Sequence, residues 1–193
     1  MDGSIIGVVL CGGDSKRMGA DKGLLLWNNK TWAEIAVQKL EHVVHKVHVS
    51  VNPNQISNYQ KLFPHHNLII DSVECRGPLA GLLSAHKEKP ENDILLLACD
   101  MVKLDIQTLK KIHDSYCKDK YYDFYVYSQH GEYEPLPGIY TSKGMRNVFS
   151  HYQNGTLRKH SLKYQLENGN TFTLYSESEN LTSYNSPSDF DLS

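Results

Sequence analysis

The sequence predicts an α/β fold of three layers, in which helices cover both faces of a Rossmann-like, mostly parallel sheet. Two observations carry this prediction. Short apolar runs recur along the chain, and segments of helical period separate them through most of the first half. Such alternation of strand and helix is typical of a parallel sheet. Because 193 residues suit one sizeable core, we expect residues 1–193 to form a single domain.

The expected strands are short apolar runs. They comprise residues 5–10, 47–51, 68–70, 94–98 and 124–127. After about residue 130 the pattern loosens, since Pro135 and Pro137 interrupt it and residues 156–168 form only a polar, helix-like stretch.

Capping residues mark the expected helix starts. Thr31 and Glu34 form a capping box, and the apolar residues after them fall on one helix face. Pro78 suits the first turn of a second helix, where its missing N–H does no harm. Asp105 is expected to cap a third helix. Residues 186–189, Ser-Pro-Ser-Asp, repeat the capping-box pattern and predict a last short helix.

The composition excludes several classes of protein. The 20 Lys and Arg residues nearly balance the 22 Asp and Glu residues, so we expect no nucleic-acid partner and no attraction to a membrane surface. The four cysteines form no CxxC pair, which argues against a zinc knuckle or a disulfide-stapled secreted fold and favours a cytoplasmic protein. No apolar stretch is long enough to span a bilayer.

The most specific pattern follows the first predicted strand, in residues 10–23: Leu-Cys-Gly-Gly-Asp-Ser-Lys-Arg-Met-Gly-Ala-Asp-Lys-Gly. Paired glycines let backbone N–H groups approach an anion, and Lys16, Arg17 and Lys22 can neutralise phosphate charge. The carboxyl end of a strand is where open α/β sheets bind ligands. The loop matches neither a Walker loop nor GxGxxG. It predicts phosphate binding; the alternative is a plain turn with solvated charges.

Three polar side chains are expected at the same edge, because each follows a predicted strand. They are Asn52, Asp71 and Asp100. The carboxylate of Asp100 could bind Mg²⁺ against triphosphate oxygens. Taken singly, Asn52 is more often a turn former and Asp71 more often a capping residue, whereas Asp100 is equally well explained as a turn or capping aspartate.

Residues 10–23 resemble the signature loop of the molybdenum cofactor guanylyltransferases and their nucleotidyltransferase relatives. Residues 76–82, Arg-Gly-Pro-Leu-Ala-Gly-Leu, resemble the Gly-Pro-Leu-Ala-Gly segment of that family. Cys99-Asp100-Met101 resembles its metal-binding Cys-Asp-Met/Thr, and residues 185–189 resemble its Asn-Thr-Pro-Glu-Asp. The likeness implies the nucleotidyltransferase fold, with a nucleotide-binding part at about 1–105 and an acceptor-binding part at about 106–193.

The resemblance implies an enzyme that transfers GMP from GTP to molybdopterin or its molybdenum-loaded form and releases pyrophosphate. Mg²⁺ is the implied cofactor and Asp100 its ligand. The implied catalytic residues are Arg17, Lys22 and Asp100, which would stabilise charge during phosphoryl transfer. The implied nucleotide-binding residues are Leu10, Cys11, Gly12, Gly13, Lys22, Asn52, Asp71 and Asp100. Transient contact with cofactor-biosynthesis proteins and apo-molybdoenzymes is also implied.

The pterin phosphate requires a second anion pocket. Its candidate residues are Arg76, Gly77, Arg158 and Asn185, with Lys159 and Lys163 as further cations. Surface cations of this kind are commonly solvated, and Asn185 could instead cap the last helix.

The choice of base is open. Guanine users in the family typically show Leu-Ala-Gly-Gly and cytosine users Leu-Ala-Ala-Gly, so the Gly12-Gly13 pair favours GTP. The alternatives are a cytidylyltransferase acting on the same pterin and a sugar-phosphate nucleotidyltransferase. A further alternative is a nucleotide- or cofactor-binding regulator without turnover, which the presence of both Lys22 and Asp100 disfavours. Cys11 and Val102 depart from the common family form without removing a charged group.

Overall fold

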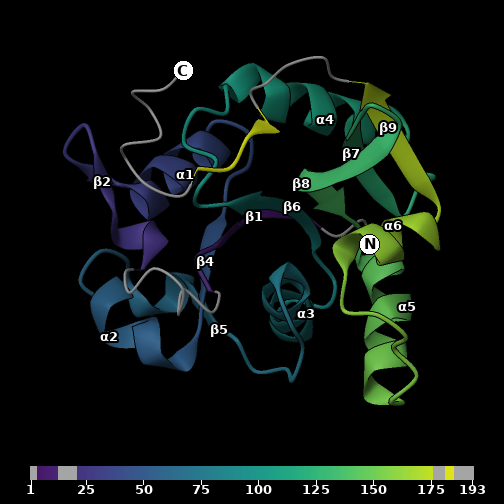
Figure 1. Cartoon of the computed structure of the whole chain (residues 1–193), viewed down its shortest axis with the longest axis horizontal. Helices are drawn as coiled ribbons and strands as arrows, with labels where there is room; N and C mark the ends of the chain where they lie inside the picture. The colour runs from purple at the N-terminus through teal and green to yellow at the C-terminus, as the bar shows by residue number, and fades with distance from the viewer. Residues whose placement is uncertain (1–3, 13–20, 176–180, 185–193) are drawn as a thin grey trace.

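The structure, a computed structural model, describes residues 4–12, 21–175 and 181–184. Within them a seven-stranded sheet runs through the molecule in the order β5-β4-β1-β6-β8-β7-β9 (Figure 1). The strands are β1 (Ile5–Leu10), β4 (Val47–Val51), β5 (Leu68–Ile70), β6 (Asp93–Ala98), β7 (Phe124–Gln129), β8 (Glu132–Tyr140) and β9 (Thr171–Tyr175). A separate hairpin joins β2 (Leu26–Trp27) and β3 (Lys30–Thr31).

The sheet is parallel apart from β8. Strand β1 pairs in parallel with β4 and β6, β4 with β5, and β7 with β9, whereas β8 runs antiparallel to β6 and β7. Leu10 at the end of β1 is in register with Ser50 of β4 and Ala98 of β6. The residues that follow these strands therefore meet at one edge of the sheet, as the sequence predicted.

Helices cover both faces of the sheet. α1 (Trp32–Glu41) and α4 (Ile106–Lys118) lie on one face, and α3 (Pro78–Glu88), α5 (Ser142–Gln153) and α6 (Leu162–Glu167) lie on the other (Figure 1). Alternation along β1 divides the core, since Val9 packs with α1 and α4 while Val8 packs with α3 and α5. The three layers are confirmed. The short helices are η2 (Lys22–Leu24), η3 (Pro53–Gln55), α2 (Ile56–Tyr59) and η4 (His65–Asn67).

The predicted helix starts are confirmed where the structure describes them. Thr31 Oγ1 accepts from the Glu34 N–H at 3.2 Å, and the Glu34 carboxylate accepts from the Thr31 N–H at 2.8 Å, which completes the capping box of α1. Asp105 caps α4 by accepting from the Thr108 N–H at 2.6 Å. Helix α3 begins at Pro78. The helix predicted at 186–189 lies outside the described residues.

Glycine in the middle of α3 lets that helix approach the sheet. A Cβ at Gly81 would lie 2.6 Å from both Leu10 Cδ2 and Ser50 Oγ, which is closer than non-bonded atoms tolerate. The Gly-Pro-Leu-Ala-Gly segment therefore brings the start of α3 against the ends of β1 and β4.

The second half of the chain differs most from the prediction. Of residues 156–168 only Leu162–Glu167 are helical, and Ser161 caps the start of this helix, α6. The ring of His160, just before the cap, accepts from the Arg76 N–H at 3.2 Å. Strand β8 includes Pro135 and Pro137, which the sequence pattern did not assign to a strand. These prolines lie where the register with β7 shifts between Val126 and Tyr127, so no ladder bond is lost.

A search of the described residues for a helix both long and apolar enough to cross a membrane finds none.

Candidate functional site at the carboxyl edge of the sheet

Backbone hydrogen bonds tie the ends of β1, β4 and β6 together. The N–H groups of Cys11 and Gly12 both donate to the Ser50 carbonyl, at 2.9 and 3.1 Å. The Leu10 carbonyl accepts from the Cys99 N–H at 3.1 Å. These bonds occupy the amides of Cys11 and Gly12 and fix the point from which the glycine loop leaves the sheet.

Gly12 lies directly against the carboxylate of Asp71. A Cβ at Gly12 would lie 2.6 Å from Asp71 Oδ2 and 3.6 Å from the Asn52 nitrogen. Asp71 is held in place because its Oδ1 accepts from Ser50 Oγ at 2.8 Å. The structure thus brings together three of the residues predicted to bind nucleotide, Gly12, Asn52 and Asp71.

Burial raises the pKa of the Asp71 carboxyl, and the hydrogen bond from Ser50 partly opposes that shift. A carboxylate that is partly removed from water favours a hydrogen-bond donor as a partner. Ribose hydroxyls and base amino groups are donors of this kind. The environment of Asp71 therefore suits contact with a nucleoside.

Asn52 organises the loop after β4 by a reciprocal cap. Its side chain accepts from the Asn54 N–H at 2.9 Å, and its own N–H donates to Gln55 Oε1 at 2.9 Å. The cap turns Gln55 inward, so that Gln55 Nε2 donates to the Cys11 carbonyl at 3.0 Å and to Asp21 Oδ2 at 2.6 Å. Gln55 thereby joins the start of the glycine loop to its far end.

Asp21 is the centre of a buried network that the sequence analysis did not identify. Its Oδ1 accepts from Tyr59 Oη at 2.9 Å and from the Gly23 N–H at 3.1 Å. The spacing of Asn52 and Gln55 is that of a capping box and could have revealed η3. No comparable local pattern marks Tyr59, which contacts Asp21 from 38 residues away. The network fixes the segment that carries Lys22.

Lys22 and Asp100, predicted to be catalytic, lie together. Lys22 Nζ donates to Asp100 Oδ2 at 3.0 Å and to the Tyr184 carbonyl at 3.3 Å. The Tyr184 N–H in turn donates to the Asp100 carbonyl at 3.0 Å. The start of η2, the loop after β6 and the segment 181–184 therefore converge on one ion pair.

The second oxygen of Asp100 is suited to a metal ion. Oδ1 is buried and has no hydrogen-bond partner within the described part of the chain. A buried carboxylate oxygen without a partner is costly unless a ligand satisfies it. In the described ranges no three His, Cys, Asp or Glu side chains gather as a metal site. A single carboxylate such as Asp100 suits Mg²⁺, which is commonly bound by one or two carboxylates together with substrate phosphates.

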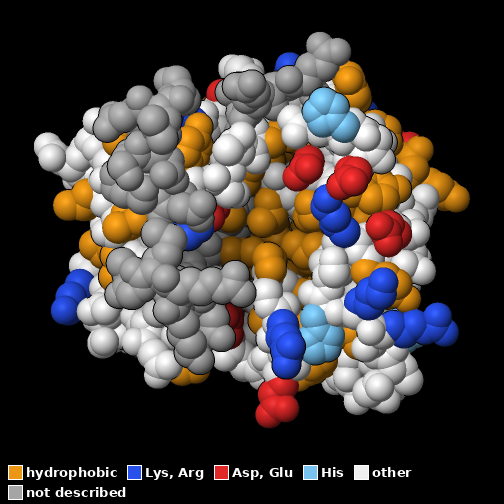
Figure 2. Space-filling view, in the orientation of Figure 1, with side chains coloured by type: hydrophobic (Ala, Val, Ile, Leu, Met, Phe, Trp, Pro, Cys, Tyr) orange, Lys and Arg blue, Asp and Glu red, His pale blue; other side chains and the backbone are white. Residues whose placement is uncertain are grey.

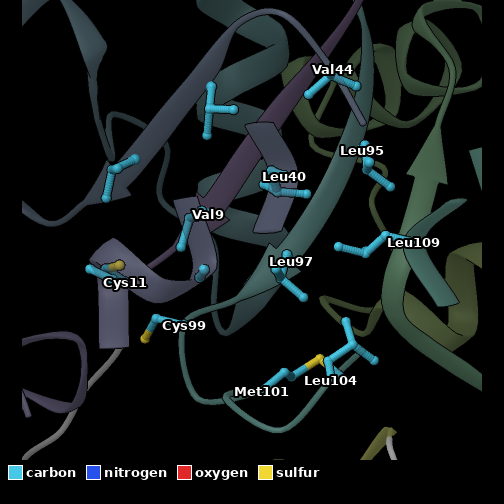
Figure 3. Close-up of a cluster of buried hydrophobic side chains, with 14 of the residues drawn as sticks. Val9, Cys11, Leu40, Val44, Leu95, Leu97, Cys99, Met101, Leu104 and Leu109 are labelled. Atoms are coloured by element: carbon cyan, nitrogen blue, oxygen red, sulfur yellow. The ribbon is translucent and has the colours of Figure 1, made fainter. Parts of the chain in front are cut away.

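Two cysteines line the base of the site. Cys11 and Cys99 follow neighbouring strands, and both side chains are buried in the core cluster (Figure 3). Burial raises the pKa of the Cys11 thiol, and the neighbouring Cys99 raises it further. Since the thiolate is the reactive form, this environment disfavours thiol chemistry at Cys11.

The residues predicted to bind the acceptor are partly dispersed. Gly77, with φ of 66°, introduces α3 beside Arg76, whose side chain is exposed. Arg158 instead lines a cavity of about 500 Å³ between α5 and α6. Lys159 lies over the Tyr164 ring, 5.1 Å from its centroid, and Lys163 pairs with Glu132 at 2.9 Å. The Arg76 N–H donates to His160 Nδ1 at 3.2 Å, two residues beyond Arg158 in the sequence.

Three further predicted residues, Gly13, Arg17 and Asn185, lie outside the described residues. The face drawn in Figure 2 is hollowed at its centre, with hydrophobic side chains on the floor and both basic and acidic side chains around it. A concave surface with apolar walls and a few charged groups is the common form of a small-molecule site.

Comparison with known proteins agrees with this geometry. The family described as the MobA-like NTP transferase domain matches residues 7–167. A probable molybdenum cofactor guanylyltransferase from Geobacillus sp. (strain WCH70) is 32% identical over 144 residues, which are 74% of this chain and 72% of that protein. The molybdenum cofactor guanylyltransferase of Haemophilus influenzae (strain 86-028NP) is 25% identical over 96% of this chain and 95% of its own.

The fold also matches a solved structure. The crystal structure of molybdopterin-guanine dinucleotide biosynthesis protein A from Archaeoglobus fulgidus superposes with a TM-score of 0.75, covering 97% of this chain and 96% of that one. The two sequences are 18% identical, so this likeness concerns the fold alone. It confirms the nucleotidyltransferase fold expected from the sequence.

Proposed function

The chain belongs to the MobA-like NTP transferase family, and we propose that it transfers GMP from GTP to molybdopterin, or to its molybdenum-loaded form, with release of pyrophosphate. The product would be a guanine dinucleotide cofactor. One observation carries the assignment to nucleotidyl transfer: Lys22, the cation proposed for the triphosphate, lies 3.0 Å from Asp100, whose buried Oδ1 has no hydrogen-bond partner among the described residues. The names of the relatives support the choice of pterin as acceptor.

The reaction is an in-line substitution at the α-phosphorus of GTP. A phosphate oxygen of the pterin forms the new P–O bond while the bond from the α-phosphorus to the bridging oxygen breaks, and that oxygen leaves with pyrophosphate. The nucleophile is already anionic, so the protein supplies no general base. Catalysis then depends on orientation and on stabilising the charge that develops on the leaving group.

Lys22 supplies the positive charge for the triphosphate. Its ammonium is partly buried, with 27% of the side chain exposed, and is oriented by Asp100 and the Tyr184 carbonyl. A cation in a partly desolvated site interacts with phosphate more strongly than a surface lysine does. Arg17 is the second cation of the proposed site, although it lies outside the described residues.

Asp100 is the residue that would hold Mg²⁺, through Oδ1. When bound, Mg²⁺ would neutralise charge on the triphosphate oxygens. The chain's own contribution is to keep this carboxylate at the end of β6, with its other oxygen already paired to Lys22.

Asp71 and Asn52 are proposed to contact the nucleoside. Both lie beside Gly12, and because Gly12 has no Cβ the Asp71 carboxylate has room to approach the loop. The preference for guanine over cytosine rests on the family pattern at Gly12 and Gly13 and is the part of the proposal that most needs a direct test.

The test is a panel of GTP, CTP, ATP and UTP, each assayed for pyrophosphate release with Mg²⁺ and molybdopterin. We expect GTP to be used best and no release without the pterin. The second part of the test uses a folded Asp100→Asn protein, which keeps the side-chain volume but weakens the metal ligand. Its turnover should fall by at least about tenfold, or roughly 1.4 kcal/mol of barrier.

Each outcome separates the alternatives. Preference for CTP would identify a cytidylyltransferase on the same pterin, and release only with a sugar phosphate would replace the acceptor. A chain that binds GTP but releases no pyrophosphate at any protein concentration would be a binding regulator, and the enzyme proposal would be wrong.

A further inference from the structure

Lys39 is a cation behind the site, on the helix α1 that packs against the sheet. It belongs to none of the sequence motifs described above. It lies in the last turn of α1, and its Nζ donates to the Met101 carbonyl at 3.1 Å and to the Val102 carbonyl at 2.5 Å. These two residues directly follow Asp100. Lys39 thus contacts the loop from β6 to α4 from 62 residues away.

The loop that Lys39 contacts is built around buried side chains. Met101, Val102 and Leu104 are 1%, 2% and 2% exposed. Met101 and Leu104 turn into the cluster that also contains Leu97 and Leu109 (Figure 3). A loop anchored in the core this way brings its carbonyl groups into a poorly solvated region, where each needs a donor.

Lys39 supplies that donor. Its side chain is half-buried, and within the described ranges it makes no ion pair with a carboxylate. Burial lowers the pKa of Lys39 to about 8, and the charge of Asp105 partly offsets that shift. The fold therefore keeps a lysine in a place that is unfavourable for its charge, and the two carbonyls are what it binds there.

The backbone around Asp100 is consequently held from two sides. The Tyr184 N–H donates to the Asp100 carbonyl at 3.0 Å, and Lys39 binds the next two carbonyls along the chain. The Met101 N–H also donates to the Ala98 carbonyl at 3.2 Å, which tightens the turn. The direction of the Asp100 side chain depends on this turn.

We propose that Lys39 is a positioning residue for the reaction: by binding the carbonyls of Met101 and Val102 it orients Asp100, so that Oδ1 is the carboxylate oxygen kept for the metal ion. The inference rests on the proposed function. Lys39 itself touches neither Asp100 nor Lys22 in any contact that the structure describes. Residues that orient a metal ligand commonly affect metal affinity about tenfold or more.

The test compares three variants of the full chain. Lys39→Met keeps the apolar stem and removes the ammonium, Lys39→Arg keeps a cationic donor, and Lys110→Met removes an exposed lysine of α4 as the matched control. We expect Lys39→Met to weaken Mn²⁺ binding, measured by electron paramagnetic resonance, by about tenfold. The kcat for pyrophosphate release should fall comparably, whereas the KM for GTP stays within about twofold. Lys39→Arg should recover most of both losses.

Amide hydrogen exchange over residues 99–104 keeps the inference testable apart from activity. Exchange should be faster in Lys39→Met than in wild type and Lys110→Met. If Lys39→Met does not fold, Lys39→Gln takes its place with the same expected order. Wild-type Mn²⁺ affinity and kcat in a folded Lys39→Met protein would overturn the positioning role. If wild type releases no pyrophosphate, the proposed function fails, while Mn²⁺ binding and hydrogen exchange still decide what Lys39 does.

Discussion

Lys22 Nζ and Asp100 Oδ2 lie 3.0 Å apart and join segments separated by 78 residues in the sequence. Their side chains are 27% and 17% exposed, so the pair is better shielded from water than the surface pair between Lys163 and Glu132. Surface ion pairs contribute about 0–1 kcal/mol, and shielding increases the cost of removing one partner. The ion pair therefore fixes the position of the Lys22 ammonium relative to the end of β6.

Replacing Lys22 by alanine tests its role in turnover. Lys22→Ala removes the cation proposed for the triphosphate, and we expect pyrophosphate release to fall by at least about tenfold, or roughly 1.4 kcal/mol of barrier, while the fold persists. Steady-state kinetics with circular dichroism check both parts. Lys30→Ala removes an exposed lysine outside the site and should leave the rate unchanged. Equal rates for Lys22→Ala and wild type would rule out a catalytic role.

Gly12→Ala tests the contact between the loop and Asp71. The new Cβ would lie 2.6 Å from Asp71 Oδ2, so the carboxylate must move and loses its bond from Ser50. We expect the free energy of unfolding to fall by about 1–3 kcal/mol, the usual range for overpacking. Urea unfolding measures it.

A double-mutant cycle isolates the cause of that loss. Asp71→Ala removes the group that the new methyl would meet, so adding Gly12→Ala to this background should cost much less than it costs in wild type. An equal cost in both backgrounds would place the effect in the backbone of the loop instead.

The first half of the fold was predictable because local signals and tertiary contacts agree there. The Thr31 and Asp105 caps and the apolar strands mark the elements that form. The second half was not, because β8 tolerates Pro135 and Pro137 only at a register shift that pairing with β7 creates. Residues 156–161 are not helical, and His160 among them contacts Arg76 across 84 residues. Such tertiary contacts leave no local pattern in the sequence.

The site follows the same rule. Strand ends predicted that Asn52, Asp71 and Asp100 would lie at one edge, and they do. Lys39 was missed because its side chain contacts Met101 from 62 residues away, with no local pattern to mark it. Gln55 has a local signal in its capping box with Asn52, but its bond to the Cys11 carbonyl, across 44 residues, has none. Sequence motifs identify the side chains expected to contact a ligand. The side chains that hold them in place become apparent only in the folded structure.

Tyr59→Phe tests the network that fixes the Lys22 segment. Tyr59 is fully buried, and its hydroxyl donates to Asp21 Oδ1 at 2.9 Å. Removing a hydrogen bond to a charged group costs about 1.5–3 kcal/mol. We expect thermal unfolding to show that loss, and Tyr121→Phe, at a tyrosine that is 69% exposed, to change stability by less than about 0.5 kcal/mol. Similar values for the two variants would show that the Asp21 bond contributes little.

The burial of Asp71 predicts a pH dependence of stability. Burial raises the pKa of Asp71 in the folded state above its value in the unfolded chain, near 3.9, with the Ser50 bond opposing it. As pH rises between those two pKa values, the folded state binds more protons than the unfolded state, so the free energy of unfolding falls. Asp71→Asn removes this titration, and the stability of the variant relative to wild type should therefore increase as pH rises from about 4, and then level off.

Urea unfolding of both proteins between about pH 4 and pH 7 measures this difference in stability, with Asp114→Asn as the control at an exposed carboxylate. A difference that stays flat, or that decreases as pH rises, would show that Asp71 is not destabilised by its burial beside Gly12.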